Sequence, residues 1–402
     1  MDLLNNSAKP FIFFNHSKKD QFDVDQANDF MNIAYCQAVC ASGAVSPNPF
    51  VGAAVVKDGK LLSCAAHKEA GFAHAEVESF LPLTDNQLEG ADLYVTLEPC
   101  SHYGKTPPCV KLIIEKKIAR VFIGMKDPNP LVNSKGIALL QDANIKVYIA
   151  DNQLPLFQLN QPFLKGLATK RSYLVAKIAI TLDGKIATQS GNSKWISNSQ
   201  ALAQVDYIRS KVAGILIGEN TLVLDNPSLT LRTLSKDVIT SKGSYTPYRI
   251  ALIKELERID PHLSIFSAFN DSKTILFLPK RYKNSTLLSS FPLQKENFIF
   301  YSGQKAKFDF ILEECYKRGI NSILLEGGAS LISQAFIEDA IDMGQFFIAP
   351  KIIGDPKAIN PFNFSKSKTM VAKTIYEAFT LKDVQPISYG DNCSFLFRQK
   401  FY

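Results

Sequence analysis

The chain has 402 residues, of which 46% are hydrophobic and 21% charged, and its formal net charge is +7. This length exceeds the roughly 100–200 residues of one domain, so two or three domains are expected. The apolar fraction excludes a disordered protein, and the dispersed lysines suit an anionic small substrate at least as well as nucleic acid. No apolar run reaches the roughly 20 residues of a membrane span. Residues 1–23 are expected to form a frayed N-terminal extension, to which no function is assigned.

From Val24 onward, the hydrophobic pattern alternates between helix and strand periods. An apolar face at spacings of three and four predicts a helix that begins at Val24 and ends near Gly43. Short apolar runs then predict strands with helical stretches between them, which indicates an α/β layered sheet. The strands are expected at 51–56, 93–97, 121–125 and 145–149, and the helices at 75–80, 110–117 and 137–143.

A mixed stretch at 152–170, with Pro155 and Pro162, is expected to link a first domain of residues 24–150 to a second domain of residues 172–402. The second domain is also predicted to be α/β. Two polar, turn-rich stretches, 233–248 and 255–272, are expected to be surface loops or insertions. Strands are expected at 173–180, 214–217, 250–253, 274–278, 297–301, 322–325 and 346–348, and helices at 201–211 and 331–339.

The segment His74-Ala75-Glu76 is followed by Pro99-Cys100 and then by Cys109. One imidazole and two thiolates give zinc three protein ligands and leave its fourth tetrahedral position to water, as in catalytic sites. Glu76 stands two residues after the histidine and can shuttle a proton. This signature is that of zinc nucleobase deaminases, in which the glutamate is the acid and base and not a ligand. A structural cysteine and a chance His-x-Glu would explain each piece alone, but not their joint context.

Eight residues separate Cys100 from Cys109, where nucleic-acid and cytidine deaminases have two. This long loop resembles that of the riboflavin-pathway deaminases, as do the segments Pro47-Asn48-Pro49 and Lys126-Asp127-Pro128-Asn129-Pro130. The resemblance implies a cytidine-deaminase-like, three-layer α/β/α domain.

The same resemblance implies that Asn48 binds the pyrimidine, whereas Lys105, Asp127 and Asn129 hold the ribose phosphate arm. A flexible ammonium such as that of Lys105 suits a phosphate. A turn role is the alternative for the asparagines and the aspartate. Because zinc already has three ligands, His67 and His102 remain candidate substrate contacts, with an ordinary polar position as the alternative.

The second domain lacks a G-x-G-x-x-G fingerprint after any strand, so a Rossmann cofactor site is not supported. The segment from Leu324 to Ser330 instead predicts a strand, a diglycine turn and the start of a helix. Such a turn lets the backbone approach a phosphate, which the helix N-terminus favours. Taken alone, the segment is equally compatible with a plain strand-to-helix turn.

Motifs across the second domain resemble the reductase half of the bifunctional riboflavin-biosynthesis enzymes, the RibD family. They include the segments 181–185, 218–221, 225–227, 229–232 and 349–351. The resemblance implies a dihydrofolate-reductase-like α/β fold and two sets of site residues. Substrate contacts are expected from Lys177, Ser193, Arg209, Leu229, Arg232 and Glu326, and cofactor contacts from Ala179, Trp195, Thr221, Asp225, Gly327, Gly328, Ala329 and Ser330.

The two arginines of the substrate set suit a bidentate phosphate clamp, and a solvated surface charge is the alternative for either one. Glu219 departs from the family pattern, because a smaller or apolar residue is expected at its position. Seven cysteines at irregular spacing argue against a disulfide framework and predict a cytoplasmic protein. Cys36, Cys40 and Cys64 are expected to be buried apolar groups.

The resemblance covers residues 24–400 and implies an enzyme with two reactions. The first is hydrolytic deamination of 2,5-diamino-6-ribosylamino-4(3H)-pyrimidinone 5′-phosphate with one zinc ion per chain, and the second is reduction of the ribosyl group by NADPH. The expected partner is this phosphorylated pyrimidine, with neither nucleic acid nor membrane, and the chain is expected to form a homo-oligomer. The alternatives are a nucleic-acid-editing zinc deaminase with an accessory domain, and a regulatory module that binds nucleotides without turnover.

Overall fold

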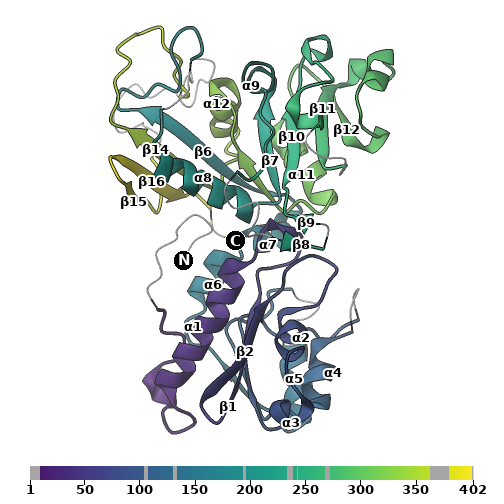
Figure 1. Cartoon of the computed structure of the whole chain (residues 1–402), viewed down its shortest axis with the longest axis vertical. Coiled ribbons are helices and arrows are strands. Elements are labelled where there is room, and N and C mark those ends of the chain that lie inside the picture. The colour runs from purple at the N-terminus through teal and green to yellow at the C-terminus, as the bar shows by residue number, and fades with distance from the viewer. Residues whose placement is uncertain are drawn as a thin grey trace. The chain divides into compact units, whose positions relative to one another are not determined.

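The computed structural model describes residues 10–103, 107–129, 134–192, 196–232, 239–241, 243–267, 272–362, 380–400 and 402. The chain forms two compact units, Met1–Ala168 and Thr169–Tyr402 (Figure 1). Each unit has its own sheet and its own hydrophobic core. Within the ranges just given, none of the helices is both long enough and apolar enough to cross a membrane.

The first unit is built on a five-stranded sheet in the order β2-β1-β3-β4-β5. Strand β1 runs antiparallel to both of its neighbours, whereas β3, β4 and β5 are parallel. Figure 1 shows α1 on one face of this sheet and α2, α4 and α5 on the other, so the predicted three-layer arrangement is confirmed. The bounds are α1 Val24–Cys40, β1 Gly52–Lys57, β2 Lys60–Ala66, α2 Ala75–Phe80, α3 Asp85–Leu88, β3 Asp92–Val95, α4 Cys109–Glu115, β4 Arg120–Ile123, α5 Lys135–Asp142 and β5 Lys146–Ile149.

Helix α1 packs its small apolar face directly on β1. Asp23 caps the helix by accepting a hydrogen bond from the amide of Gln26. The contact is close, because a Cβ added at Gly52 would lie 2.0 Å from the carbonyl oxygen of Ala34. Cys36 and Cys40 stand one turn apart on the opposite face and are exposed, so the prediction that they are buried is wrong.

Residues 10–22 pack against the first unit, so the expectation of a frayed extension is wrong for them. The main-chain amides of Phe11 and Phe13 donate to the side chains of Asn32 and Asn28, at 2.8 and 2.7 Å. Phe13 and Phe14 are completely buried in the core. The polar asparagines on α1 therefore hold an apolar segment in place.

The stretch at 152–170 is helical rather than an irregular linker. It forms α6, Leu154–Leu159, and α7, Gln161–Thr169. Leu156 and Leu159 belong to the core of the first unit, and the side chain of Asn160 accepts a hydrogen bond from the amide of Phe50 at 2.7 Å. These contacts explain why the first unit continues to Ala168.

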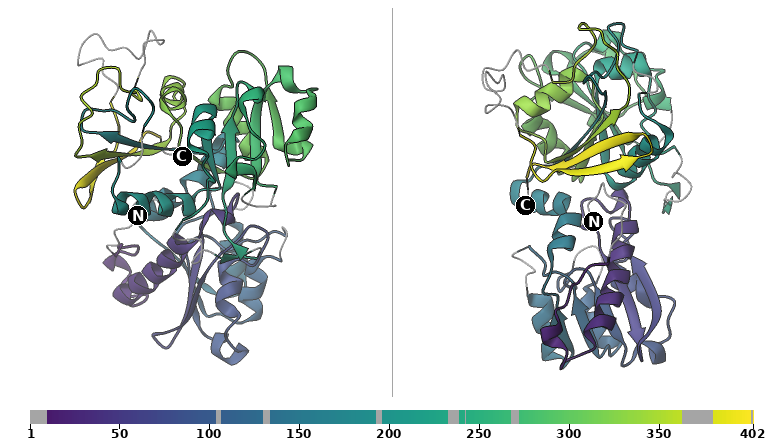
Figure 2. Two further views of the ribbon diagram at one scale, coloured as in Figure 1. Left: turned by 45° about the horizontal axis from the view of Figure 1, so that its top comes forward. Right: turned by 90° about the vertical axis from the view of Figure 1, so that its left-hand side faces the viewer.

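The second unit contains a nine-stranded sheet in the order β12-β11-β10-β7-β13-β6-β14-β16-β15. Its first seven strands are parallel, and β16 runs antiparallel to both β14 and β15. Strands β16 and β15, drawn in yellow, form one end of the sheet (Figure 2). The predicted α/β class is confirmed, although β15, β16, α9 and α11 were not expected. The bounds are β6 Tyr173–Thr181, α8 Ser199–Lys211, β7 Gly214–Gly218, α9 Glu219–Asp225, β10 Tyr248–Leu252, β11 Thr274–Pro279, β12 Phe298–Tyr301, α11 Phe308–Lys317, β13 Ser322–Leu325, α12 Ala329–Ile337, β14 Met343–Ala349, β15 Gln385–Tyr389 and β16 Asn392–Arg398.

The two stretches predicted as surface loops contribute buried residues to the second unit. In the first, Tyr245 is buried and its hydroxyl donates to the carbonyl oxygen of Val212 at 2.6 Å. In the second, Ile265 and Phe266 are buried within the short helix α10, Ser264–Ser267. A simple surface-loop interpretation is therefore wrong for these parts, because scattered apolar residues anchor them.

Candidate active sites

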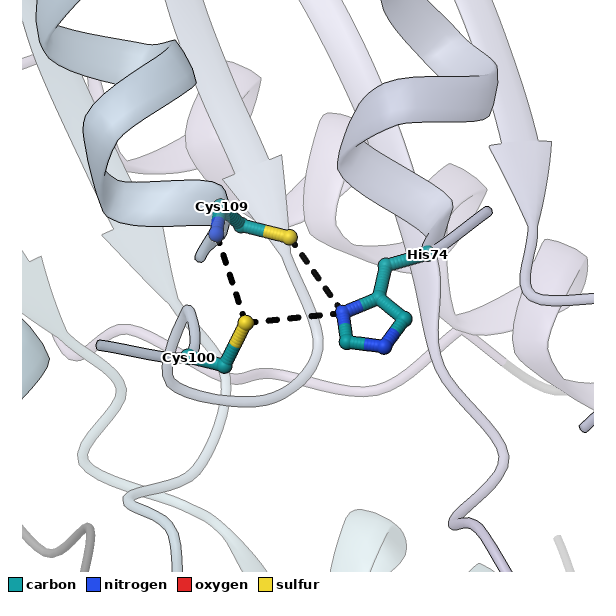
Figure 3. A group of neighbouring side chains, drawn as sticks. All are labelled: His74, Cys100 and Cys109. Carbon is teal, nitrogen blue, oxygen red and sulfur yellow. Dashed lines mark hydrogen bonds between the residues drawn. The ribbon is translucent and has the colours of Figure 1, made fainter. Parts of the chain in front are cut away.

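Three side chains with the chemistry of zinc ligands meet near the carboxyl end of β3. His74 is the N-cap of α2, Cys109 is the first residue of α4, and Cys100 lies between β3 and α4. Figure 3 shows Nδ1 of His74 facing both sulfur atoms, at 3.5 Å from Cys100 and 3.3 Å from Cys109. Ligand atoms around tetrahedral zinc lie roughly 3.5 Å apart, given bonds of about 2.3 Å to sulfur and 2.0 Å to nitrogen. These residues therefore fit a zinc ion.

The three candidate ligands shift one another's pKa values. The side chain of Cys109 and, less strongly, that of His74 lower the pKa of Cys100 to about 4 through hydrogen bonds. The same contacts with Cys100 raise the pKa values of Cys109 and His74. Binding of a cation would release the protons that these side chains still hold.

A cavity of about 400 Å³ opens beside the cluster. Glu76, in the first turn of α2, is only 3% exposed and lines this cavity together with His74 and Cys100. Burial raises the pKa of the Glu76 carboxyl above its ordinary value. A carboxyl placed in this way can accept a proton inside the cavity and return it.

Asn48 lines the same cavity and is oriented by His67. The amide nitrogen of Asn48 lies 3.0 Å from Nε2 of His67, and Nδ1 of His67 lies 2.9 Å from the carbonyl oxygen of Ala73. The carbonyl must accept from Nδ1, so Nε2 carries no proton in the neutral ring and accepts from Asn48. Burial lowers the pKa of His67, which favours this neutral form. The carbonyl oxygen of Asn48 is then directed as an acceptor.

Asp127, Asn129 and His102 also line the cavity. Oδ1 of Asp127 accepts the amide of Asn129 at 2.8 Å, and burial raises the pKa of Asp127. The structure thus brings together the described residues that the sequence assigns to the deaminase, whereas Lys105 lies outside the described residues. Sequence reasoning missed Glu98, which lines the cavity as well. The only available signal was its place directly before Pro99-Cys100.

A second group of candidate residues lies at the carboxyl ends of β6, β7 and β13, where ligands bind in open parallel sheets. The guanidinium of Arg209 donates from Nε and Nη2 to the two carboxylate oxygens of Glu326, both at 2.7 Å. Its Nη1 donates to the carbonyl oxygen of Thr230 at 3.0 Å, and the side chain is only 8% exposed. Arg209 thus makes three hydrogen bonds within the protein, and its expected use as half of a phosphate clamp stays a prediction.

Two further cations act on the Glu326 carboxylate. Burial alone would raise the pKa of Glu326, but the charges of Arg209, Lys177 and Arg232 lower it overall. Lys177, on β6, has its pKa lowered by burial and by both arginines. The exposed Arg232 is placed by its own main chain, since its amide donates to Oδ1 of Asp206 at 2.8 Å. Lys177, Arg232 and Glu326 thus form one charged group.

The diglycine turn precedes α12, and Gly328 is its N-cap. A Cβ added at Gly327 would lie 3.0 Å from the side chain of Leu331, and one at Gly328 would lie 3.6 Å from Oγ1 of Thr221. The structure thus brings Thr221 of α9 to the turn that contains Gly327, Gly328, Ala329 and Ser330. Asp225 is exposed at the end of α9.

Four further residues are expected in the reductase site: Ala179, Leu229, Ser193 and Trp195. Ala179 lies on β6 and is partly exposed. Leu229 has a left-handed φ of 53° and is buried. Ser193 and Trp195 lie outside the described residues.

Glu219, the departure from the expected pattern, ties the start of α9 to the loop after β10. Its Oε2 accepts the amides of Lys254 at 2.7 Å and Glu255 at 2.9 Å. The guanidinium of Arg258 donates to Oε1. A carboxylate is required at this position because a smaller or apolar side chain would leave these donors without their acceptor.

Comparison with protein families gives one match for each half of the chain. The RibD C-terminal domain matches residues 172–388, and the cytidine and deoxycytidylate deaminase zinc-binding region matches residues 24–125. The riboflavin biosynthesis protein RibD of Aquifex aeolicus is 35% identical over 331 residues, which cover 82% of this chain and 89% of the relative. That of Bacillus amyloliquefaciens is 36% identical over 349 residues, which cover 84% and 89%.

Two solved structures are similar over nearly the whole chain. Acinetobacter baumannii RibD, form 1, aligns with a TM-score of 0.79 at 30% identity, covering 94% of this chain and all of that one. A diaminohydroxyphosphoribosylaminopyrimidine deaminase/5-amino-6-(5-phosphoribosylamino)uracil reductase from Thermotoga maritima aligns with a TM-score of 0.76 at 28% identity, covering 94% and 99%. Both halves and their order in the chain are therefore shared with these proteins.

Proposed function

The chain belongs to the RibD family of bifunctional riboflavin-biosynthesis enzymes, and from this premise we propose which of its residues carry its two reactions. It deaminates 2,5-diamino-6-ribosylamino-4(3H)-pyrimidinone 5′-phosphate and reduces the ribosyl group of the product, using Zn²⁺ and NADPH. The observation that carries the assignment of the first site is the convergence of His74, Cys100 and Cys109 beside the cavity lined by Glu76. A family match over both halves does not favour a nucleic-acid-editing deaminase.

In the deaminase, His74, Cys100 and Cys109 would hold the zinc ion. When bound, zinc lowers the pKa of water toward about 7 and so supplies a nucleophile at neutral pH. Glu76 takes up the proton that this water gives up and delivers it to the leaving amine. Its burial favours this role, because a carboxyl whose pKa is raised is a better proton acceptor.

The rest of the cavity would bind the substrate. The carbonyl oxygen of Asn48, held by His67, accepts a hydrogen bond from an amine of the pyrimidine. Asp127 and Asn129, with Lys105, hold the ribosyl phosphate arm. The aspartate suits the hydroxyl groups of the sugar, whereas the lysine suits the phosphate.

In the reductase, NADPH would supply, when bound, the hydride that reduces the first carbon of the ribose. We assign its binding to Ala179, Trp195, Thr221, Asp225 and the turn Gly327 to Ser330, where the backbone at the start of α12 can approach a phosphate. The ribosyl substrate contacts Lys177, Ser193, Arg209, Leu229, Arg232 and Glu326. Arg209 also holds the Glu326 carboxylate in place.

We further propose that the enzyme is a cytoplasmic homo-oligomer. All seven cysteines are free, as is usual in a reducing compartment. Light scattering of the purified chain would measure its mass in solution, and a monomeric mass would contradict the oligomer.

The assignment of Glu76 is tested by Glu76→Gln in the full-length, zinc-loaded enzyme. Deamination, measured as ammonia release, should fall by several orders of magnitude, because the amide cannot shuttle a proton. Zinc content and NADPH oxidation with the deaminated intermediate should stay at wild-type levels, since neither depends on that carboxylate. Loss of zinc from this variant would show that Glu76 supports the metal rather than the proton transfer.

A further inference from the structure

Glu98 is a buried carboxylate whose acceptor capacity is taken up by main-chain amides. It lies two residues before Cys100 and is 3% exposed. Its Oε2 accepts the amides of Asp127 at 3.3 Å and Ser134 at 3.1 Å. Its Oε1 accepts those of Gly136 at 3.1 Å and Ile137 at 3.3 Å. One side chain thus binds two stretches of backbone that lie far from it in the sequence.

Helix α5 depends on this carboxylate for its first turn. The N-cap Ser134 has a φ of 62°, and its side chain makes no capping hydrogen bond. Glu98 accepts the first-turn amides of Gly136 and Ile137 in its place, and the helix dipole favours its negative charge. The approach is close, because a Cβ added at Gly136 would lie 2.3 Å from the carbonyl oxygen of Pro99. The start of α5 is therefore docked on the segment that leads to Cys100.

We propose that Glu98 is a positioning residue for deamination, which fixes Asp127 and Asn129 relative to the metal ligand Cys100. The proposal rests on the proposed function, in which this aspartate and asparagine hold the ribosyl phosphate arm. The amide of Asp127 donates to Glu98, and Oδ1 of Asp127 accepts the amide of Asn129. Glu98 thereby joins the part of the cavity that removes the amine to the part that holds the sugar. By fixing the spacing between these two parts of the cavity, Glu98 selects substrates whose amine and ribosyl phosphate arm are separated by the same distance.

The test is Glu98→Gln in the full-length, zinc-loaded enzyme. The replacement keeps the shape of the side chain but turns one acceptor oxygen into a donor, so amides now bound to that oxygen lose their partner. We expect KM for the phosphorylated substrate to rise about 10- to 100-fold with kcat within about threefold, because ground-state contacts are lost. The same pyrimidine without its ribosyl phosphate should keep its wild-type kcat/KM. Hydrogen exchange at Asp127, Gly136 and Ile137 should be at least about tenfold faster.

Glu115→Gln is the matched control, because this exposed glutamate at the end of α4 undergoes the same chemical change without burial. Loss of zinc from Glu98→Gln, or an equal loss of kcat/KM with both pyrimidines, would overturn the positioning role. If Glu98→Gln does not fold, Gly136→Ala takes its place, since it displaces α5 from Pro99 and leaves the carboxylate intact. The same KM pattern is expected, and a wild-type KM would overturn the proposal.

The failure of the proposal and the failure of the proposed function give different results. A wild-type enzyme that does not distinguish the two pyrimidines would refute the assignment of Asp127 and Asn129 to the phosphate arm. Unchanged amide exchange in Glu98→Gln would instead refute the positioning role, whatever the substrate preference of the wild type.

Discussion

Replacing Glu326 by glutamine should destabilise the second unit more than replacing Arg209 by methionine. Both side chains are nearly buried, at 13% and 8% exposure, and share two hydrogen bonds of 2.7 Å. Removing one partner of a buried pair costs about 3–5 kcal/mol, because the other charge loses its counterion. Glu326→Gln leaves Arg209 beside two further cations, Lys177 and Arg232. We therefore expect this variant to lose about 5 kcal/mol of its free energy of unfolding. In Arg209→Met the carboxylate still faces those two cations, so we expect about 3 kcal/mol.

Urea unfolding of the full-length chain measures these losses. Amide hydrogen exchange within the paired strands β6 and β13, followed at each urea concentration, reports on the second unit. The double variant should be less destabilised than the sum of the single variants by about 2–3 kcal/mol, because the interaction can be lost only once. Arg209→Met with wild-type stability would refute the reasoning, since the ion pair with Glu326 would then contribute nothing to the fold.

Two further predictions concern the metal and acid stability. Cys109→Ser should lose zinc and deamination, since a hydroxyl is a poor replacement for a thiolate, and should still oxidise NADPH with the deaminated intermediate; stoichiometric zinc by metal analysis would contradict the ligand assignment. Asp183 has its pKa lowered from 3.8 to about 2, first by the hydroxyl of Thr181 and then by the amides of Gly354 and Ile353. Because the folded pKa is the lower one, Asp183 stabilises the fold above pH 3.8, and this contribution disappears as the pH falls through about 2. Between these pH values, Asp183→Asn should therefore lose less stability than wild type when unfolding is followed by calorimetry. Identical slopes of stability against pH for the two proteins would exclude the effect.

The zinc site was predictable from sequence because its pieces are local. A histidine and a carboxylate two residues apart share the start of α2, and the cysteines flank one loop. The pattern of α1 was equally readable, since its apolar stripe has the helical period. That same period places Cys36 and Cys40 on the outer face, so the error there came from applying an average preference of cysteine instead of its position.

The contacts that could not be predicted are those between distant segments. Arg209 and Glu326 are 117 residues apart, and the sequence near either residue does not indicate that the two side chains form an ion pair. Residues 10–22 look polar overall, yet two asparagines on α1 pair with their backbone and bury Phe13 and Phe14. Strand β15 alternates half-buried and exposed residues, and β16 begins by alternating buried and exposed ones, patterns that a search for apolar runs does not detect.

The central place of β6 in its sheet has a consequence for synthesis of the protein. This first strand of the second unit pairs with β13 and β14, beginning with Tyr173 beside Ser322. Translation at about 5–20 residues per second needs roughly 8–30 seconds to reach its partners. During that time an apolar strand has neither neighbour, whereas the first unit is already complete. Newly made chains should therefore pass through a stage with a folded deaminase and an aggregation-prone second half. Binding by chaperones is needed most at this stage.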